Sequence, residues 1–257
     1  MIRVTSLFRR PAEPRTIIVE FGDATFNVRV TRNRRARRYT LRINNAAREA
    51  VLTMPLRGNL ADASRFARAH GGWLAQRLLQ LPPTAPFSEG EIVPLRGVDH
   101  RIVHRAGARG TVWTERAGDE ALLCIAGARE HMARRVRDYL KREARRDLDA
   151  AVTAYARALD VRVRRLSIRD QSSRWGSCNS VGVLSFSWRL ILTPPMVLDY
   201  LAAHEVAHLV EMNHSAHFWK LLRRICPATD AATLWLDSHG NALHRYGAAK
   251  QSDRSAA

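Results

Sequence analysis

Leu198 to His214 reads LDYLAAHEVAHLVEMNH and contains the pattern HExxH, followed six residues later by a third histidine. Apolar residues recur in this stretch at helical spacing, which predicts an amphipathic, mostly buried helix. His204 and His208 are four residues apart and therefore lie on one face of that helix, where a single tetrahedral zinc ion can bind both imidazoles. Glu205 follows the first histidine and is placed to act on a metal-bound water.

The metal interpretation has a simpler alternative, a buried helix whose histidines hydrogen-bond to backbone or water. Three features favour the metal. The flanks of the motif are apolar and helical, and no proline or glycine interrupts it. In addition, Asn213-His214 is expected to end the helix and turn a third histidine back toward the first two.

The composition is that of a folded protein with a large excess of positive charge. The 257 residues carry a formal net charge of +18, and lysine occurs only at Lys141, Lys220 and Lys250, so arginine supplies nearly all of it. Such a balance favours association with nucleic acid or another anionic surface. Genome-level base composition also enriches arginine without selecting a partner, and the sequence leaves both explanations open.

Cysteine usage and hydropathy exclude several classes of protein. Cys124, Cys178 and Cys226 are widely spaced and form no CxxC pair, which indicates neither a disulfide framework nor an all-cysteine zinc site. No run of about 18 apolar residues predicts a membrane span, and the first residues lack the apolar segment of a secretory signal. We therefore expect a cytoplasmic protein.

The pattern of elements predicts two domains and two tails. Residues 1–15 are expected to form a loose basic tail and residues 248–257 a disordered one. Between them, residues 16–127 are predicted to form a β-rich N-terminal module with one helix, and residues 128–247 an α+β catalytic domain.

In the N-terminal module, Thr16 to Thr31 alternates apolar and polar residues around Gly22-Asp23, which predicts a β-hairpin. The basic segment Arg32 to Arg38 follows; it could contact phosphates, or keep a hairpin edge from pairing. Asn59 is expected to cap a helix from Leu60 to Leu81, whose middle is weakened by Gly71-Gly72. Further strands are predicted at residues 39–43, 49–54, 91–95, 99–105, 111–114 and 121–125.

In the catalytic domain, Arg129 to Leu159 predicts a long helix with an apolar stripe and a strongly basic back. Such a helix either rests on an anionic surface or packs on the core with a solvated face. The strands Val161 to Arg169 and Val183 to Leu192 are expected to form a hairpin through the turn-rich link between them. Pro194-Pro195 opens the HExxH helix. Two more helices are predicted, at residues 215–225 and 230–244.

Three motifs together resemble one known family. The run SRWGSC, the run LSFSWRL and the helix HEVAHLVEMNHSAHFW are similar to those of the YgjP-like metallopeptidases, which belong to the zincin group. These are in turn similar to the SprT and Wss-type proteases that act on protein–DNA crosslinks. The resemblance is detailed from about Arg165 to Tyr246 and weaker over the rest. It implies a zincin-like fold, with helices packed on a small antiparallel sheet.

The resemblance also implies roles for individual residues. His204 and His208 match the two ligands on the helix, Glu205 the general base and His214 the third ligand of one zinc ion. The interval HExxHxxxxxH is also that of metzincins, but Glu211 stands where those enzymes have glycine, and no Met-turn is recognisable. His217 is a competitor for the third ligand.

Residues outside the motif helix are harder to assign. The resemblance implies that Arg174 faces the cleft, where it either contacts a substrate carboxylate or a developing oxyanion, or has only a structural role. Asn213 either contacts the substrate or the zinc ligands, or simply ends the helix. Trp175 and Cys178 are expected to be structural, and Asp237 and His239 are candidates for holding the ligands in place.

The chemistry that follows is that of a zinc metallopeptidase. Three neutral imidazoles leave a position on the metal for water, which Glu205 deprotonates and directs at a peptide carbonyl. The strand Val183 to Leu192 is expected to be the edge on which an extended peptide substrate lies. Two rivals remain: a nucleoside triphosphate pyrophosphatase using the same zinc, and a nucleic-acid-associated protein in which zinc is structural. The intact Glu205 argues against the latter.

Overall fold

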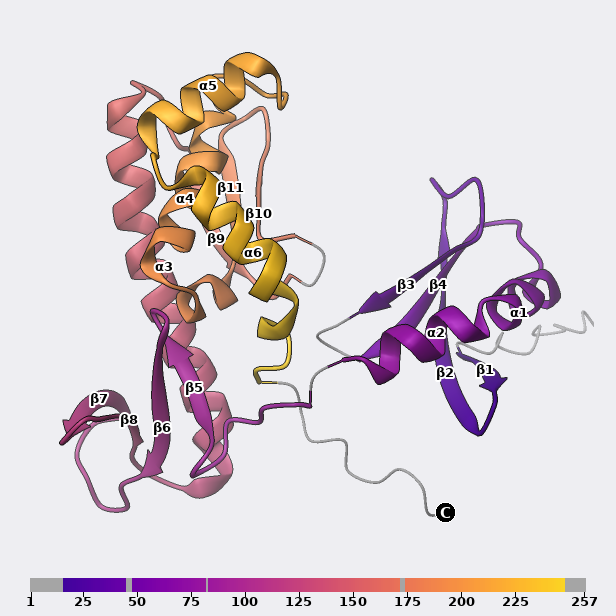
Figure 1. Ribbon diagram of the computed structural model, residues 1–257, viewed down its shortest axis with the longest axis horizontal. Helices are drawn as coiled ribbons and strands as arrows, with labels where there is room; N and C mark the ends of the chain where they lie inside the picture. Colours follow the sequence, from indigo (N-terminus) through magenta and orange to yellow (C-terminus); the bar gives the residue numbers. More distant parts are fainter. Residues whose placement is uncertain (1–15, 45–47, 82, 172–173, 248–257) are drawn as a thin grey trace, which may run out of the picture. The chain divides into compact units, whose positions relative to one another are not determined.

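The computed structural model describes residues 16–44, 48–81, 83–171 and 174–247. The chain divides after Leu81 into two compact units, each with its own hydrophobic core (Figure 1). The two predicted tails lie outside the described residues. No helix among the described residues is both long enough and apolar enough to cross a membrane.

The first unit is a four-stranded sheet with two helices. Its elements are β1 (Thr16–Phe21), β2 (Ala24–Asn33), β3 (Thr40–Asn44), β4 (Glu49–Pro55), α1 (Leu60–Ala69) and α2 (Gly71–Leu79). The strand order is β1-β2-β4-β3, and β2 pairs with β4 in parallel. The predicted hairpin is confirmed, since β1 and β2 pair antiparallel around Gly22, whose φ of 57° suits glycine. Asn59 caps α1 by accepting a hydrogen bond from the backbone N–H of Ala61.

The single helix predicted from Leu60 to Leu81 is two helices, α1 and α2, that meet at His70. Glycine disfavours a continuous helix, which accounts for the break at this point. The same glycines make room for Phe21. A Cβ added to Gly71 or to Gly72 would lie 3.1 Å from atoms of the Phe21 ring.

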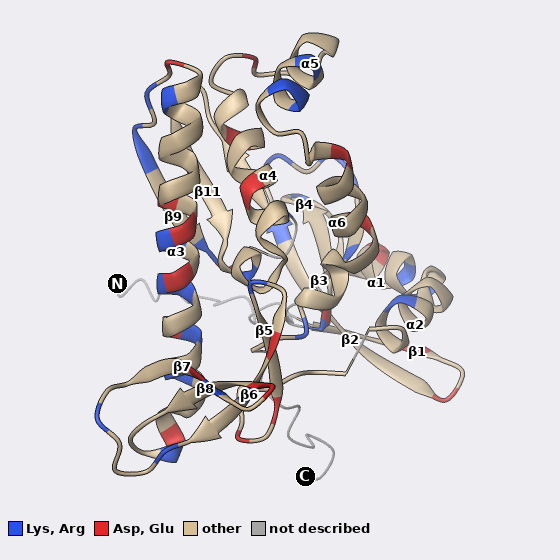
Figure 2. Cartoon of the chain, turned by 60° about the vertical axis from the view of Figure 1, so that its left-hand side comes forward, with Lys and Arg blue, Asp and Glu red and all other residues tan. Residues whose placement is uncertain are grey.

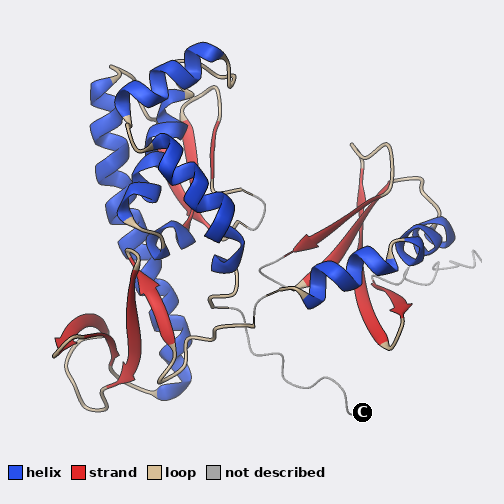
Figure 3. Ribbon diagram, in the orientation of Figure 1, coloured by secondary structure: helices blue, strands red, loops and turns tan. Residues whose placement is uncertain are grey.

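The second unit combines two sheets with four helices among its described residues. The strands are β5 (Ile92–Leu95), β6 (Val98–His104), β7 (Val112–Ala117), β8 (Glu120–Ile125), β9 (Arg165–Arg169), β10 (Gly176–Cys178) and β11 (Val183–Ser187). The helices are α3 (Met132–Ala158), α4 (Pro195–Ala207), α5 (Ala216–Ile225) and α6 (Thr229–Leu243), with short 3-10 helices η1 (Arg129–His131) and η2 (Trp188–Leu192). One sheet has the order β5-β6-β8-β7 and the other β10-β11-β9. Figure 3 shows the α+β character of both units.

The division after Leu81 differs from the boundary predicted at residue 127. Strands β5 to β8 bury Ile102 and Leu123 in the same core as Val136 and Leu140 of α3, and that core extends to Val206 of α4. The four strands therefore belong with the helices that follow them. Periodicity cannot reveal this, because it shows which residues are buried but not which other element covers them.

The sheet beside the motif helix is mixed, where a small antiparallel sheet was predicted. The strands β9 and β11 pair in parallel, so the hairpin predicted between them is wrong. The hairpin that does form joins β10 to β11. The strand predicted to run to Leu192 ends at Ser187, and Trp188–Leu192 forms the fully buried η2. As a result, β11 is the central strand and β10 is an edge.

The motif helix α4 is shorter than predicted. It begins with Pro195 in its first turn, as expected, but ends at Ala207, and His208 occupies its C-cap. The backbone N–H of Val210 and that of Glu211 both donate to the carbonyl of Ala207, which closes the helix end as a turn. The HExxH motif thus occupies the last turn of α4, where the helix dipole favours a cation.

Candidate metal centre

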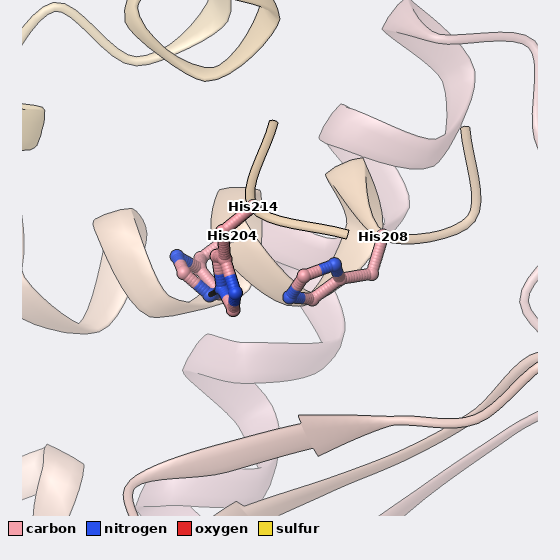
Figure 4. A group of neighbouring side chains, drawn as sticks. All are labelled: His204, His208 and His214. Carbon is pink, nitrogen blue, oxygen red and sulfur yellow. Dashed lines mark hydrogen bonds between the residues drawn. The ribbon is translucent and has the colours of Figure 1, made fainter. Parts of the chain in front are cut away.

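The structure brings His204, His208 and His214 together. One ring nitrogen from each lies within 4.8 Å of the others, and no other group of three or more potential metal ligands occurs among the described residues. The three rings point toward one another (Figure 4). His204 Nε2 and His214 Nε2 are 3.0 Å apart. Nitrogens bound to one tetrahedral zinc at about 2.0–2.1 Å would be roughly 3.3 Å apart, so the three residues fit such an ion.

Hydrogen bonds to the far side of two rings orient them for metal binding. His208 Nδ1 lies 3.1 Å from the carbonyl oxygen of Glu211, which can only accept, so Nδ1–H donates and Nε2 keeps its lone pair. Tyr200 Oη lies 3.4 Å from His204 Nδ1. When Nδ1–H donates to that oxygen, Nε2 of His204 is likewise available as a ligand.

The turn after α4 delivers His214. Ser215 caps α5, its Oγ accepting from the N–H of Phe218 at 3.2 Å, and its own N–H donates to the carbonyl of Asn213. This reverses the chain between α4 and α5. The competitor His217 is exposed on α5 and does not belong to the histidine group.

Two aromatic residues of α5 hold the imidazoles in place. Phe218 is fully buried and stacks on His208, with ring centroids 4.6 Å apart and an interplanar angle of 24°. Trp219 stacks on His214 at 5.7 Å and 29°. Because these rings pack against the histidines, the three side chains have little freedom to turn away from one another.

Burial sets the protonation of the histidines. It lowers the pKa of His204 to about 4, and the neighbouring His208 and His214 lower it further in the same direction. Burial lowers the pKa of His208 as well, against the opposing effect of the Glu211 carbonyl. Both imidazoles are therefore neutral near pH 7, as metal ligation requires.

Glu205 is buried beside the histidines, with only 4% of its surface exposed. Burial raises the pKa of its carboxyl group to about 7, and the charge of Arg174 acts in the opposite direction. A carboxylate with a pKa near neutrality is suited to accept and return protons at working pH.

A cavity of about 280 Å³ opens onto Glu205 and His204. Its walls come from three parts of the second unit, and it is lined by Trp175, Gly176, Tyr200, Leu201, His204, Glu205, Thr233, Leu236 and Asp237. The edge strand β10 thus forms one wall, and α6 forms another. The sequence alone suggested a turn at Gly176 and no functional role for Gly176, Tyr200 or Thr233.

The remaining predicted residues have different environments. Arg174 is exposed and close enough to Glu205 to affect the pKa of its carboxyl group. The side chain of Asn213 is exposed. Asp237 lines the cavity, whereas His239 stacks on Trp235 and contacts its carbonyl.

Trp175 and Cys178 were expected to be structural. Trp175 packs against the core and stacks on His244 at 5.3 Å, and it also lines the cavity. Cys178 is half-buried; burial raises the pKa of its thiol to about 11, and Glu205 adds to this. Trp175 thus has a place in the site as well as in the core.

Among the site residues not assigned a functional role from sequence, Gly176 and Phe218 stand within the motifs that carry the family resemblance, and Tyr200 had a signal in helix spacing. Tyr200 precedes His204 by four residues and therefore shares its helix face. The contacts of Gly176, Phe218 and the Glu211 carbonyl depend on elements that meet only in the folded chain.

Comparison with known proteins bears on the identity of this site. A family model described as YgjP-like, metallopeptidase domain, matches residues 37–239, which is more than half of the chain. No curated protein matches the chain. The matched range includes all three histidines, Glu205 and the β10–β11 hairpin. The chain therefore belongs to the YgjP-like metallopeptidase-domain family.

Proposed function

We propose that this protein is a zinc-dependent peptidase in which His204, His208 and His214 hold one zinc ion and Glu205 is the general base. The observation that carries the proposal is the convergence of three oriented imidazoles beside a buried carboxylate. Family membership supports a metallohydrolase. When bound, zinc supplies a Lewis acid that activates water and polarises a carbonyl.

The chain's own residues would carry the proton. Glu205 is the group in the cavity that accepts a proton from the attacking water and returns it to the leaving amine. Burial raises the pKa of its carboxyl group, which favours uptake of the proton. Arg174 supplies a positive charge that favours the ionised form of Glu205 and is a candidate contact for a substrate carboxylate or oxyanion.

The substrate is proposed to lie along β10, which corrects the expectation that β11 provides the edge. The backbone N–H of Ser187 donates to the carbonyl of Trp175, and that of Asn179 donates to the carbonyl of Val183. Residues 175 and 179 therefore face β11. Because direction alternates along a strand, Gly176 and Cys178 turn their backbone groups outward. An extended peptide can pair with those groups beside Glu205.

The test compares the zinc-loaded protein with Glu205→Gln on a library of extended peptides and, in parallel, on nucleoside triphosphates. We expect the variant to bind zinc like the parent and to lose peptide hydrolysis by at least about 1,000-fold. Unchanged turnover would refute the role of Glu205. If the protein hydrolyses nucleoside triphosphates but no peptide, it is a nucleotide pyrophosphatase and not a peptidase. If it binds zinc but hydrolyses neither class of substrate, the alternative in which zinc is structural is favoured.

A further inference from the structure

We propose that a second site in the catalytic unit, a groove between α3 and residues 161–169, binds a single strand of nucleic acid through its phosphates. The groove has a volume of about 1200 Å³ and shares no lining residue with the cavity at the metal centre. We call it the α3–β9 groove. Eight cationic residues and one carboxylate line it. Such an imbalance, concentrated in one hollow, favours a polyanion.

One wall of the groove is the segment that leads into β9 and β9 itself. It contributes Arg162, Arg164, Arg165 and Arg169, all of them exposed. Within the described part of the chain, no carboxylate lies within ion-pair distance of any of these four arginines. Figure 2 shows the basic residues of this segment beside α3. Their charges are therefore available to a ligand.

The other wall is one face of α3, on which some of the cations are paired with carboxylates and others are not. Lys141, Arg142, Arg145 and Arg146 line the groove. The acidic residues Glu143 and Asp147 bind Arg96, which lies outside the lining, at 2.8 and 2.7 Å. They also contact Arg146 of the lining, at 2.6 and 3.5 Å. Within the described residues, Lys141 and Arg142 form no ion pair with a carboxylate, so their charges are available to an anionic partner.

The one acidic residue of the lining belongs to a structural contact. Asp149 binds Arg145 at 2.5 Å, and Arg145 Nη1 also donates to the carbonyl of Leu166 at 2.8 Å. Arg145 thereby ties α3 to β9. The same bond occupies the backbone carbonyl of Leu166 in β9, which disfavours pairing of this strand with an acidic peptide. Nucleic acid, which needs no backbone pairing, is the better fit.

The lining also indicates how the strand is recognised. Among the described residues that line the groove there is no aromatic and no amide side chain. The uncharged lining residues are aliphatic, except for the hydroxyl residues Thr153 and Ser167. Base stacking and base-edge hydrogen bonds need such groups. Arginine guanidinium groups instead match phosphate oxygens. Recognition is therefore of the backbone and independent of sequence.

The size of the groove fits one strand. Residues 162–169 extend over at most about 25 Å, which corresponds to on the order of seven nucleotides at the 3.4 Å rise of a stacked strand. Because cations face the hollow from both walls, they can reach one backbone from both sides. The proposal concerns binding and does not depend on peptidase activity, so the two can fail independently.

The test measures fluorescence anisotropy of the zinc-loaded full chain with a labelled oligothymidylate of about twelve nucleotides, across about 50 to 200 mM salt. The variant R162Q/R164Q/R165Q removes three charges from the groove, and R109Q/R116Q/R224Q removes three exposed charges of the same unit that do not line the groove. We expect the groove variant to bind at least tenfold more weakly, with a salt slope smaller by about 2. We expect the affinity of the matched control for the oligonucleotide to be within about twofold of the parent's. A change of this size is smaller than the effect of losing one phosphate contact.

Several outcomes would overturn the proposal. The first two are that the parent does not bind the oligonucleotide and that both triple variants lose the same amount of affinity. The other two are that a duplex binds more tightly than the single strand and that polyglutamate displaces the oligonucleotide as effectively as unlabelled oligonucleotide does. Arg142→Gln, on the α3 wall, provides a second measurement should the triple variant unfold. It is expected to weaken binding by severalfold without altering the folded structure, because Arg142 is exposed.

Discussion

Gly176 of β10 lies directly against the side chain of Glu205: a Cβ added to Gly176 would be 2.8 Å from Glu205 Cγ and closer still to its carboxylate. Contacts under about 3.0 Å do not occur for real Cβ atoms, so any side chain at this position must displace the glutamate. The general base proposed on α4 is therefore positioned by an edge strand that comes nearly thirty residues earlier in the sequence.

Gly176→Ala is expected to retain zinc and to lose peptide hydrolysis by about 100-fold, because a shift of about 1 Å at a catalytic group has an effect of that size. The measurement is kcat/KM together with metal content. Ser177→Ala, in the same strand, is the control and should remain close to the parent. Equal activity of Gly176→Ala and the parent would show that Glu205 is not the group that sets the rate.

Cys178→Pro tests the proposed substrate edge. Proline removes one outward-facing N–H from β10 and is tolerated on edge strands. The loss of one hydrogen bond to a bound peptide, about 0.5–1.5 kcal/mol, should lower kcat/KM for extended peptides roughly two- to tenfold. Cys178→Ala keeps the N–H and should leave kcat/KM unchanged. If both substitutions reduce kcat/KM equally, the thiol of Cys178 is needed for activity and the backbone edge of β10 is not the substrate-binding strand.

His214→Ala and His217→Ala separate the two candidates for the third ligand. His214 lies within 4.8 Å of its partners' ligand atoms, whereas His217 is exposed outside the group. Loss of His214 should weaken zinc binding by at least about 100-fold, more than the loss of a residue that only supports a ligand. Metal titration with a chelating competitor measures this. The reverse order of effects would reassign the ligand.

Stability should fall in mild acid partly because of His244. Burial, with a further contribution from Arg189, lowers the pKa of this histidine to about 4 in the folded protein. The unfolded chain binds a proton below about 6.5 and the folded chain does not, so folding weakens as the pH falls from about 6.5 to 4. The full effect of His244 is on the order of 3 kcal/mol.

His244→Phe keeps a ring to stack on Trp175 and cannot titrate. The free energy of unfolding, measured by denaturant titration between about pH 7 and pH 4.5, should therefore fall less steeply for the variant than for the parent. Contributions from the metal-site histidines are common to both proteins and cancel in the difference. Parallel curves would show that His244 is not buried in its neutral form.

Much of the local structure could be predicted from sequence because it depends on near neighbours. The hairpin around Gly22, the cap at Asn59 and most helix and strand positions follow from turn chemistry and periodicity. The end of α4 could not be predicted, since apolar residues continue past His208 at helical spacing. The chain leaves the helix there and reverses before α5, which begins at the Ser215 cap.

The spacing of His204 and His208 determined by itself that two imidazoles share a helix face, because helix geometry fixes the relation of residues four apart. The sequence also placed the carboxylate of Glu205 next to the first of them. Only the tertiary structure decided which histidine joins them, which strand stands beside Glu205 and which carbonyl orients His208. It also gathered eight cations from α3 and from residues 161–169 into one groove. These relations join segments distant in sequence, and they depend on how elements pack in a shared core, which no local pattern encodes.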